Sequence, residues 1–390
     1  MSTRQRTGGT PLKGEATRVC FPYEGTERGG SHVSSLGLIQ HLDRNRFEPL
    51  VVLSALEGGV YELFQEAGVP VIKSPVAAGL PRGAGFSPTH IWKILPTVSP
   101  LTRFLKEQRI DIVHTNDGRS HAMWAAPAKL SGAKLFWHHR SGPGVLGLRY
   151  VAPLMADQVA SVSRFSSPKP GFYSAANKNE VVYSPFDISI REDRDPARRA
   201  IIEELGVDPA TILVGYFGTF NQMKRPRGFV DAIAAMGGAH PVLGLMFGPD
   251  DDERIKAVKA HAIAIGVADK VKFMGYRSPG AQWMAGCDLL LVPAVGEPFG
   301  RTLVEAMLVE TPIVATDAGG NPEAVVHEET GVLVPPDDPQ ALAQAALRVL
   351  FDPDLQGKIV HNAREMALSR FGEEKHAQSI MALYDRMLTV

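Results

Sequence analysis

The sequence has few cysteines, no excess of charge of either sign and no long hydrophobic run. The two cysteines, Cys20 and Cys287, are far apart, so they cannot build a disulfide framework or a zinc site by themselves. Lys plus Arg total 41 and Asp plus Glu total 42. The resulting net charge of −1 argues against a dedicated nucleic-acid binder, which needs a basic excess to neutralise phosphates. No apolar run approaches the roughly 20 residues that span a bilayer.

The first residues are polar. Residues 1–16 contain early arginines, several glycines and a proline, but no apolar stretch follows them as it would in a secretory signal. We interpret this segment as a disordered leader. The sequence therefore predicts a cytoplasmic protein, with peripheral contact at the inner face of a membrane as the alternative.

The remaining sequence has a globular composition and two alternating patterns. Its 390 residues suit about two domains. Short β-rich runs alternate with longer helical patterns, which predicts α/β domains with parallel sheets covered on both faces. The expected strands are Thr17–Phe21, Phe47–Leu53, Val69–Lys73, Ile110–His114, Lys134–Trp137, Gln158–Val162, Val181–Tyr183, Ile212–Phe217, Leu243–Phe247, Val271–Met274, Leu289–Val292, Ile313–Ala315 and Val332–Val334.

The pattern predicts two doubly wound, Rossmann-like domains at 17–190 and 191–370, followed by a terminal helix at 371–390. The join is expected within Ser184–Pro196, where two prolines and dense charge are typical of an exposed linker. A helix is expected over Ile94–Gln108, with its firm start near Leu101 because of two prolines. Ligands of open parallel sheets bind beyond the carboxyl ends of the strands, so the site is expected in loops that follow strands, in a cleft between the domains.

The most informative segment is Gly296–Met307, which follows an apolar strand and opens a helix. Glu297 lies in the loop and Glu305 lies eight residues later, in the helix. Pro298 and Gly300 let the chain turn sharply, so amides at the helix start can hold anions or sugar hydroxyls. A carboxylate is a good acceptor for paired hydroxyls. From spacing alone, however, a capping or solvated role for both carboxylates is the simpler interpretation.

Residues Asp288–Pro335 resemble the C-terminal signature of the retaining glycosyltransferases of family 4, which have the GT-B fold. The matching pieces are CDLLLVPAVGEPFGRTLVEAML, TPIVATDAGGNPEAV and TGVLVPPDDPQALAQAAL. The N-terminal half resembles the family more weakly, in ERGGSHVSSLGLIQHL, DIVHTND and VASVSRFS. The resemblance implies two Rossmann-like domains that face a central cleft, with the C-terminal helix returning to the N-terminal domain. It also implies that the C-terminal domain binds the donor and the N-terminal domain the acceptor.

The resemblance also implies roles for the residues of this segment. Glu297 would contact the donor sugar and Glu305 the nucleoside ribose. Amides of the segment would hold sugar hydroxyls and the diphosphate. The donor-binding residues implied here are Glu297, Pro298, Phe299, Gly300, Arg301, Thr302, Leu303 and Glu305.

The family places an Arg and a Lys five residues apart after the first strand of the C-terminal domain. Here Lys224 matches the Lys, but Thr219 stands at the Arg position. This difference matters because an Arg can grip a phosphate in bidentate fashion and a Thr cannot. Either Arg225 or Arg227 compensates, or Lys224 and helix amides hold the diphosphate alone.

In the N-terminal half, the resemblance points to one glycine pair and one histidine pair. Gly29 and Gly30 precede a helical run, where the family places the junction of donor and acceptor; an ordinary flexible turn is the alternative. His138 and His139 follow a strand, near the family's catalytic-site histidine, and we slightly favour His139. The predicted catalytic residues are thus His139, His138, Glu297 and Lys224.

Other motifs do not support competing chemistry. The segment Gly142–Gly147 matches G-x-G-x-x-G, but it lies outside the first βα unit and no acidic residue follows about 20 residues later. Asp-x-Asp triplets, such as Asp250–Asp252, arise easily in turns. We therefore expect no metal and no cofactor beyond the nucleoside-diphosphate sugar that serves as donor substrate.

The favoured function is retaining, metal-independent transfer of a sugar from a nucleoside diphosphate to an acceptor hydroxyl. The alternatives are a non-catalytic nucleotide-sugar-binding protein, given Thr219, and a sugar-nucleotide 2-epimerase of similar fold. The acceptor stays open between a glycan, a lipid-linked molecule and a small molecule. The stretch Gly79–Pro100 mixes Arg82, Trp92 and Lys93 with apolar residues, which suits an acceptor lip or a membrane contact, or simply a loop and a helix start.

Overall fold

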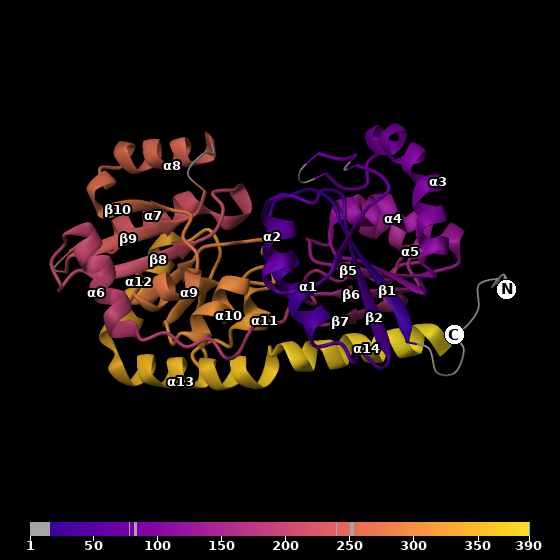
Figure 1. The fold of residues 1–390 in the computed structure, drawn as a ribbon. Coiled ribbons are helices and arrows are strands. Elements are labelled where there is room, and N and C mark those ends of the chain that lie inside the picture. Colours follow the sequence, from indigo (N-terminus) through magenta and orange to yellow (C-terminus); the bar gives the residue numbers. More distant parts are fainter. Residues whose placement is uncertain (1–15, 78, 82–83, 239, 250–252, 390) are drawn as a thin grey trace, which may run out of the picture. The chain divides into compact units, whose positions relative to one another are not determined.

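The computed structural model describes residues 16–77, 79–81, 84–238, 240–249 and 253–389. The predicted leader, apart from Ala16, lies outside these residues, as do Arg82 and the triplet Asp250–Asp252. The chain divides into two compact units (Figure 1). Unit 1 comprises residues 1–185 and 373–390, and unit 2 comprises residues 186–372.

Unit 1 is built on a parallel sheet that, in the described residues, has seven strands in the order β3-β2-β1-β4-β5-β6-β7. The strands are continuous apolar runs because both faces of such a sheet are covered. They are β1 (Thr17–Tyr23), β2 (Phe47–Leu53), β3 (Val71–Lys73), β4 (Ile112–Thr115), β5 (Lys134–His139), β6 (Gln158–Ser161) and β7 (Asn179–Val181). The helices are α1 (Gly30–Gln40), α2 (Gly58–Glu66), α3 (Ile91–Glu107), α4 (Gly118–Ser131), α5 (Ala152–Met155) and α14 (Glu373–Thr389), with short turns η1 (Pro88–His90), η2 (Gly147–Val151) and η3 (Ala176–Lys178).

Two hydrophobic clusters cover the faces of this sheet. One joins the sheet to α3, α4 and α5 through residues such as Leu101 and Trp124. The other joins it to α1, α2 and α14 through residues such as Leu38, Ile380 and Tyr384. Figure 1 shows α14, drawn in yellow, beside indigo elements from the start of the chain. The predicted return of the last helix to the N-terminal domain is thus confirmed.

Unit 2 repeats the plan with a parallel sheet of six strands, in the described residues, in the order β10-β9-β8-β11-β12-β13. The strands are β8 (Ile212–Phe217), β9 (Val242–Phe247), β10 (Val271–Gly275), β11 (Leu289–Val292), β12 (Ile313–Thr316) and β13 (Val332–Val334). The helices are α6 (Arg194–Leu205), α7 (Pro226–Ala235), α8 (Glu253–Ala264), α9 (Gly280–Ala285), α10 (Arg301–Leu308), α11 (Asn321–Ala324), α12 (Pro339–Phe351) and α13 (Pro353–Arg370), with turns η4 (Gln222–Lys224) and η5 (Ala268–Lys270).

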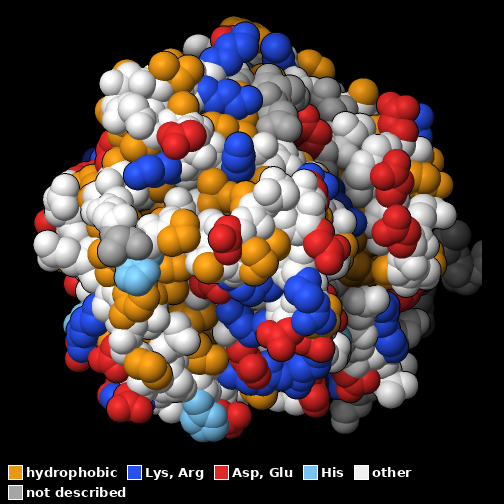
Figure 2. All heavy atoms as spheres, turned by 90° about the vertical axis from the view of Figure 1, so that its left-hand side faces the viewer, with side chains coloured by type: hydrophobic (Ala, Val, Ile, Leu, Met, Phe, Trp, Pro, Cys, Tyr) orange, Lys and Arg blue, Asp and Glu red, His pale blue; other side chains and the backbone are white. Residues whose placement is uncertain are grey.

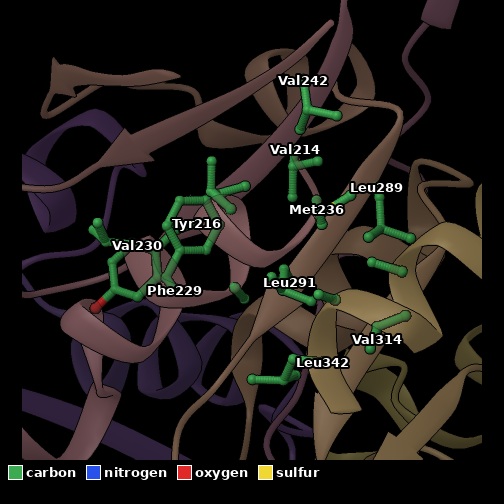
Figure 3. Close-up of a cluster of buried hydrophobic side chains, with 14 of the residues drawn as sticks. Val214, Tyr216, Phe229, Val230, Met236, Val242, Leu289, Leu291, Val314 and Leu342 are labelled. Carbon is green, nitrogen blue, oxygen red and sulfur yellow. The ribbon is translucent and has the colours of Figure 1, made fainter. Parts of the chain in front are cut away.

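The main core of unit 2 lies between its sheet and the helices α7, α8, α12 and α13 (Figure 3). Val214 and Leu291 from the sheet pack there with Phe229 of α7 and Leu342 of α12. A smaller cluster on the other face joins the sheet to α6 and α9. Each unit is therefore doubly wound, and the predicted fold class is confirmed.

Three local expectations were wrong. Helix α3 begins at Ile91 and contains Pro96 and Pro100, because most of this first half faces solvent, where carbonyls freed by the prolines can meet water. The expected linker ends early, because the Asp193 side chain accepts a hydrogen bond from the Asp195 amide and so caps α6. Strand β7 is Asn179–Val181 rather than Val181–Tyr183.

The surface charge is mixed, as the composition predicts. On the face drawn in Figure 2, basic and acidic side chains lie interspersed. None of the helices in the described ranges combines the length and apolarity that a membrane crossing requires. Trp92, in the first turn of α3, is 79% exposed, so the aromatic side chain of the predicted lip is available for contact. Membrane contact stays a prediction.

Candidate functional site

The strand order of unit 2 reverses between β8 and β11, which are neighbours in the sheet but not in the chain. In open α/β sheets, ligands bind beyond the carboxyl ends of the strands at such a reversal. The loop after β8 leads to Lys224, and the loop after β11 contains Glu297. The topology thus brings two predicted site residues to the place where a ligand is expected.

Lys224 and Glu297 form an ion pair, with 2.5 Å between Lys224 Nζ and Glu297 Oε2. The side chains are only 15% and 13% exposed, so water screens the pair less than it screens a surface pair. The Asn221 side chain accepts the Lys224 amide hydrogen at 3.0 Å, and the Lys224 stem lies over Gly218. The pair offers ammonium donors for a phosphate and carboxylate oxygens for hydroxyl groups.

The loop that contains Glu297 rests on a glycine pair that follows β12. Gly319 has φ +61°, and a Cβ there would lie 2.9 Å from the backbone N and O of Glu297. The Gly320 amide donates to the Glu297 carbonyl at 2.8 Å. Asn321 Nδ2 donates to the Ala294 carbonyl at 3.2 Å. Our sequence reasoning assigned these residues no role, although two glycines directly after a strand signal a close backbone approach.

The segment from Pro298 to Leu303 does not present all of its backbone to a ligand. Pro298 has no N–H, and the Leu303 amide donates to the Gly300 carbonyl at 3.0 Å. The first turn of α10 thus uses the Leu303 amide hydrogen, and the donor contact expected of this residue stays a prediction. The Phe299 ring is buried and lies 5.5 Å from the ring of Phe371. Phe299 anchors the loop, while Gly300 and Thr302 flank the start of α10.

Glu305 already has a partner on its own helix. Arg301 Nη2 lies 3.3 Å from Glu305 Oε1, and the Arg301 guanidinium stacks over the Phe186 ring at 4.3 Å. The Glu305 side chain remains 35% exposed, so it can still accept a hydrogen bond from a ligand. Its ribose role stays a prediction.

The structure does not bring Arg225 to the Lys224–Glu297 pair. Arg225 Nε lies 2.8 Å from Asp337 Oδ1. Arg225 lines a separate cavity of about 630 Å³, and the described residues around that cavity include Arg227 but neither Lys224 nor Glu297. Thr219 is exposed, and its hydroxyl accepts a hydrogen bond from Asn221 Nδ2 at 2.9 Å. Of the cations considered for the diphosphate, only Lys224 is paired with Glu297 in the described part of the chain.

In unit 1, the predicted glycine pair opens α1. Gly29 caps this helix in an extended conformation with φ −147°, which any residue can adopt. A Cβ at Gly29 would meet only the His32 ring, at 3.7 Å. Gly29 and Gly30 are both exposed. Their backbone is therefore accessible, as the predicted contact with a ligand requires.

The two predicted histidines end β5 and are both buried. His139 Nε2 donates to the Gly142 carbonyl at 3.1 Å, and burial lowers the pKa of His139 to about 4. Burial, reinforced by Arg140, holds the pKa of His138 well below its usual range. His138 Nε2 has no hydrogen-bond partner among the described residues. His138 thus has a buried ring nitrogen without a hydrogen-bond partner among the described residues, whereas Nε2 of His139 already has one.

The position of the proton on His138 follows from its neighbours. Arg140 Nη2 lies 3.3 Å from His138 Nδ1, and because Arg only donates, Nδ1 must accept. His114 Nε2, 3.1 Å away, then donates to the same atom, and His114 Nδ1 accepts from the Tyr384 hydroxyl. The neutral His138 ring therefore carries its proton on Nε2, as a buried donor.

The comparisons with solved structures agree with this architecture. Anabaena Alr3699/HepE, solved with UDP and glucose, has a TM-score of 0.80 and 24% identity, and the match covers 95% of this chain and 100% of that one. Sucrose-phosphate synthase from Thermosynechococcus elongatus has a TM-score of 0.75 and 20% identity, with 96% and 99% covered. At these identities the likeness shows the fold.

Among curated relatives, the mannosyltransferase LpsB of lipopolysaccharide core biosynthesis, from Rhizobium meliloti, is 31% identical over 207 residues. That match covers 50% of this chain and 56% of LpsB, so the chain spans about half the length of this relative. A D-inositol 3-phosphate glycosyltransferase of Saccharomonospora viridis is 28% identical over 372 residues, which cover 89% of this chain and 79% of the relative.

Two family models match different parts of the chain. Residues 29–177 match the glycosyl transferase 4-like domain, and residues 197–366 match the glycosyl transferases group 1. The second match contains the Lys224–Glu297 pair and the glycine pair beneath it. With its two Rossmann-like units and these two matches in order, the chain belongs to the group 1 glycosyl transferases of family 4, which have the GT-B fold.

Proposed function

We propose that this protein transfers a sugar from a nucleoside-diphosphate sugar to an acceptor hydroxyl, with retention at the anomeric carbon and without a metal ion. The observation that carries the proposal is the Lys224–Glu297 ion pair at the strand reversal of unit 2. In the proposed mechanism, Lys224 and amides at the start of α10 stabilise the leaving diphosphate. Glu297 then accepts hydrogen bonds from the donor sugar.

The names of relatives support this assignment at the level of reaction class. LpsB is a mannosyltransferase, the Saccharomonospora relative is an inositol phosphate glycosyltransferase, and the Anabaena protein was solved with UDP and glucose. We extend from them only the use of a nucleotide-sugar donor. Retention is proposed because Asp288–Pro335 resembles the signature of the retaining glycosyltransferases of family 4. An inverted product anomer in NMR spectra would contradict it.

The first experiment compares thermal stability with UDP, GDP, ADP and NAD, each without and with EDTA. A ligand at 100 times its dissociation constant adds about 2.7 kcal/mol of stability. We expect a shift with one nucleoside diphosphate that EDTA does not change. A response to NAD alone, or one abolished by EDTA, would contradict the proposal.

The second experiment separates transfer from its alternatives. The nucleotide sugar identified by thermal shift is incubated with the protein, alone and with a panel of hydroxyl acceptors. Transfer requires a new glycoside that appears only with an acceptor. Isomerisation of the donor alone would indicate a 2-epimerase, and binding without any turnover would indicate a non-catalytic binding protein.

A further inference from the structure

A buried carboxyl group lies at the carboxyl end of β1 in unit 1. Glu24 directly follows this strand, and its side chain is 1% exposed. Its Oε1 accepts a hydrogen bond from Trp124 Nε1 at 2.9 Å. Its Oε2 makes no hydrogen bond of normal geometry among the described residues, although the Ser54 side chain interacts with the carboxyl group and lowers its pKa. Buried polar atoms are normally paired, so this oxygen points to an interaction with something other than the chain.

A second unpaired group belongs to His32, in the first turn of α1. His32 is 6% exposed, and its Nδ1 accepts the Gly29 amide hydrogen at 3.0 Å. The neutral ring must therefore carry its proton on Nε2, which is buried and has no partner in the described part of the chain. Burial is the main cause that lowers the pKa of His32, so the ring is neutral at pH 7. Glu24 offers an acceptor, and His32 offers a donor.

The same charged side chains act on both groups. Asp117 raises the pKa of Glu24 and of His32, and Arg119 lowers both. The Arg119 guanidinium covers Gly25, where a Cβ would lie 2.4 Å from its Nη1. Asp117 caps α4 by accepting the amide hydrogen of Arg119 at 2.8 Å. Residues that follow β1 and residues that follow β4 thus meet around one point.

This point is the strand reversal of unit 1. Strands β1 and β4 are neighbours in the sheet, although β2 and β3 separate them in the chain. Ligands of doubly wound sheets bind at this position, beyond the carboxyl ends of the strands. The two unpaired atoms therefore lie where the topology alone predicts a ligand.

We propose that Glu24 and His32 form a hydroxyl-binding subsite of unit 1, and that its ligand is a polyhydroxylated acceptor, a sugar or a polyol. This inference rests on the proposed function and identifies the acceptor class. Hydroxyl groups both donate and accept, so they satisfy a carboxylate oxygen and an imidazole N–H together. The guanidinium groups of Arg119 and Arg140 act on this subsite together with the carboxyl groups of Glu24 and Asp117, so it carries no large excess of positive charge that would select an anionic ligand.

The ionisation of Glu24 fits this task. Burial is the main cause that raises its pKa to about 7, aided by Asp117 and opposed by Trp124, Arg119 and Ser54. At neutral pH Glu24 is therefore close to half ionised, and a hydroxyl that donates to the carboxylate favours the ionised form. Binding of a polyol should strengthen as the pH rises through 7, and this dependence should disappear in Glu24→Gln.

The test uses the full chain and three variants. Glu24→Gln keeps an oxygen for Trp124 but cannot ionise. In His32→Asn, the amide oxygen can replace Nδ1 as acceptor for Gly29, but nothing replaces Nε2. Glu66→Gln is the matched control, because Glu66 is an exposed carboxylate at the end of α2. Thermal stability and nucleotide affinity are measured first, since both should stay near wild type in a folded variant.

The probes are methyl α-D-glucoside and myo-inositol, with inorganic phosphate as the anionic comparison. Binding is followed through the His32 ring signal in ¹H–¹³C NMR spectra, assigned by its loss in His32→Asn. We expect at least one polyol to shift this signal in the wild type and in Glu66→Gln. We expect its apparent dissociation constant to rise about tenfold or more in Glu24→Gln. A shift with phosphate alone, or equal affinity in Glu24→Gln and Glu66→Gln, would overturn the proposal.

Turnover in the same samples separates this inference from the proposed function. If transfer occurs and the KM for the acceptor is unchanged in Glu24→Gln and His32→Asn, the subsite is refuted while the function stands. If no transfer occurs but a polyol still shifts the His32 signal in a Glu24-dependent way, the subsite stands and the function is refuted. Should Glu24→Gln fail to fold, His32→Asn and the wild-type pH dependence decide the question.

Discussion

The two units share one topology but carry different chemistry at the same place. In unit 2, the strand reversal holds a charged pair, Lys224 and Glu297, joined by a short ion pair. In unit 1, the corresponding edge holds buried imidazoles and the buried carboxyl of Glu24, with Asp117, Arg119 and Arg140 acting on them. All the buried histidines of the described chain, six in number, belong to unit 1.

The comparison teaches that the doubly wound sheet supplies the place for a ligand, and that the loops decide which ligand it is. A fixed ammonium suits a diphosphate. Neutral donors and a titratable carboxyl suit hydroxyl groups, because hydroxyls can match each of them.

Replacing the cation of unit 2 should have the largest effect. In Lys224→Met, the leaving diphosphate loses its ammonium partner, and loss of one such stabilising group costs about 10²–10³ in kcat. The measurement is the rate of transfer from the nucleotide sugar selected by thermal shift. Lys256→Met is the control, because Lys256 is an exposed lysine of the same unit, paired with Glu253. Equal kcat in the two variants would refute the role of Lys224.

Acid should unfold unit 1 before unit 2. A histidine whose pKa is lower in the folded state takes up its proton on unfolding, so stability falls as the pH falls below 6.5. For His139, whose folded pKa is about 4, the loss between pH 6.5 and pH 4 is about 3 kcal/mol. Glu24 has the opposite effect. Because its pKa is raised in the folded state, the free energy of unfolding falls as the pH rises from 4.5 to 7.

Hydrogen exchange read by mass spectrometry in graded urea can follow both units at once. We expect peptides from α4 and β5 to lose protection at a lower urea concentration at pH 5 than at pH 7. Peptides from β8 and β11 should shift less. Loss of protection in both units at the same urea concentration at pH 5 would refute the expectation that acid destabilises unit 1 more than unit 2.

A methyl group at Gly319 should disturb the loop that contains Glu297. Gly266 provides the control, because it also has positive φ (+73°) but has no atom within 4 Å of a Cβ. Gly266→Ala should cost about 1 kcal/mol of unfolding free energy from backbone strain. Gly319→Ala should cost about 1–3 kcal/mol more, because the methyl meets the Glu297 backbone. Urea titrations of both variants measure the difference. Equal losses of unfolding free energy would show that the loop containing Glu297 moves aside without a penalty.

Removing the Glu305 carboxylate should have the smallest effect. We expect Glu305→Ala to weaken binding of the nucleoside diphosphate about tenfold, the equivalent of one hydrogen bond to a charged group. Calorimetry measures this change. Glu365→Ala, at an exposed position of α13, should bind as the wild type does. Unchanged affinity in Glu305→Ala would remove the ribose role.

The fold was largely predictable because strands of a buried parallel sheet are continuous apolar runs. Leu289–Val292 and Val332–Val334, for example, form strands with the predicted bounds. Periodicity failed where local signals conflict with tertiary context. Pro96 and Pro100 suggested a late helix start, yet α3 contains both on a mostly solvent-facing segment.

The site was predictable only in part. The E-x7-E spacing and Lys224 are visible in sequence, and the structure pairs Lys224 with Glu297. Glu24 gave no such signal, because a single carboxylate after a strand resembles any solvated loop residue. Its burial depends on Trp124, which lies 100 positions away along the chain. Only the folded sheet reveals that one oxygen of this carboxylate has no partner.

The return of α14 to unit 1 determines the order in which the chain can complete its fold. During synthesis, domains fold as their residues emerge from the ribosome. All of unit 2 is made before α14, so the earlier unit must wait for the later one. Until α14 arrives, Tyr384 cannot donate to His114, and the apolar face formed by Val19 and Leu38 stays open. Unit 2, second in the sequence, is thus the first that can finish, and nascent unit 1 exposes this apolar face until the last helix is made.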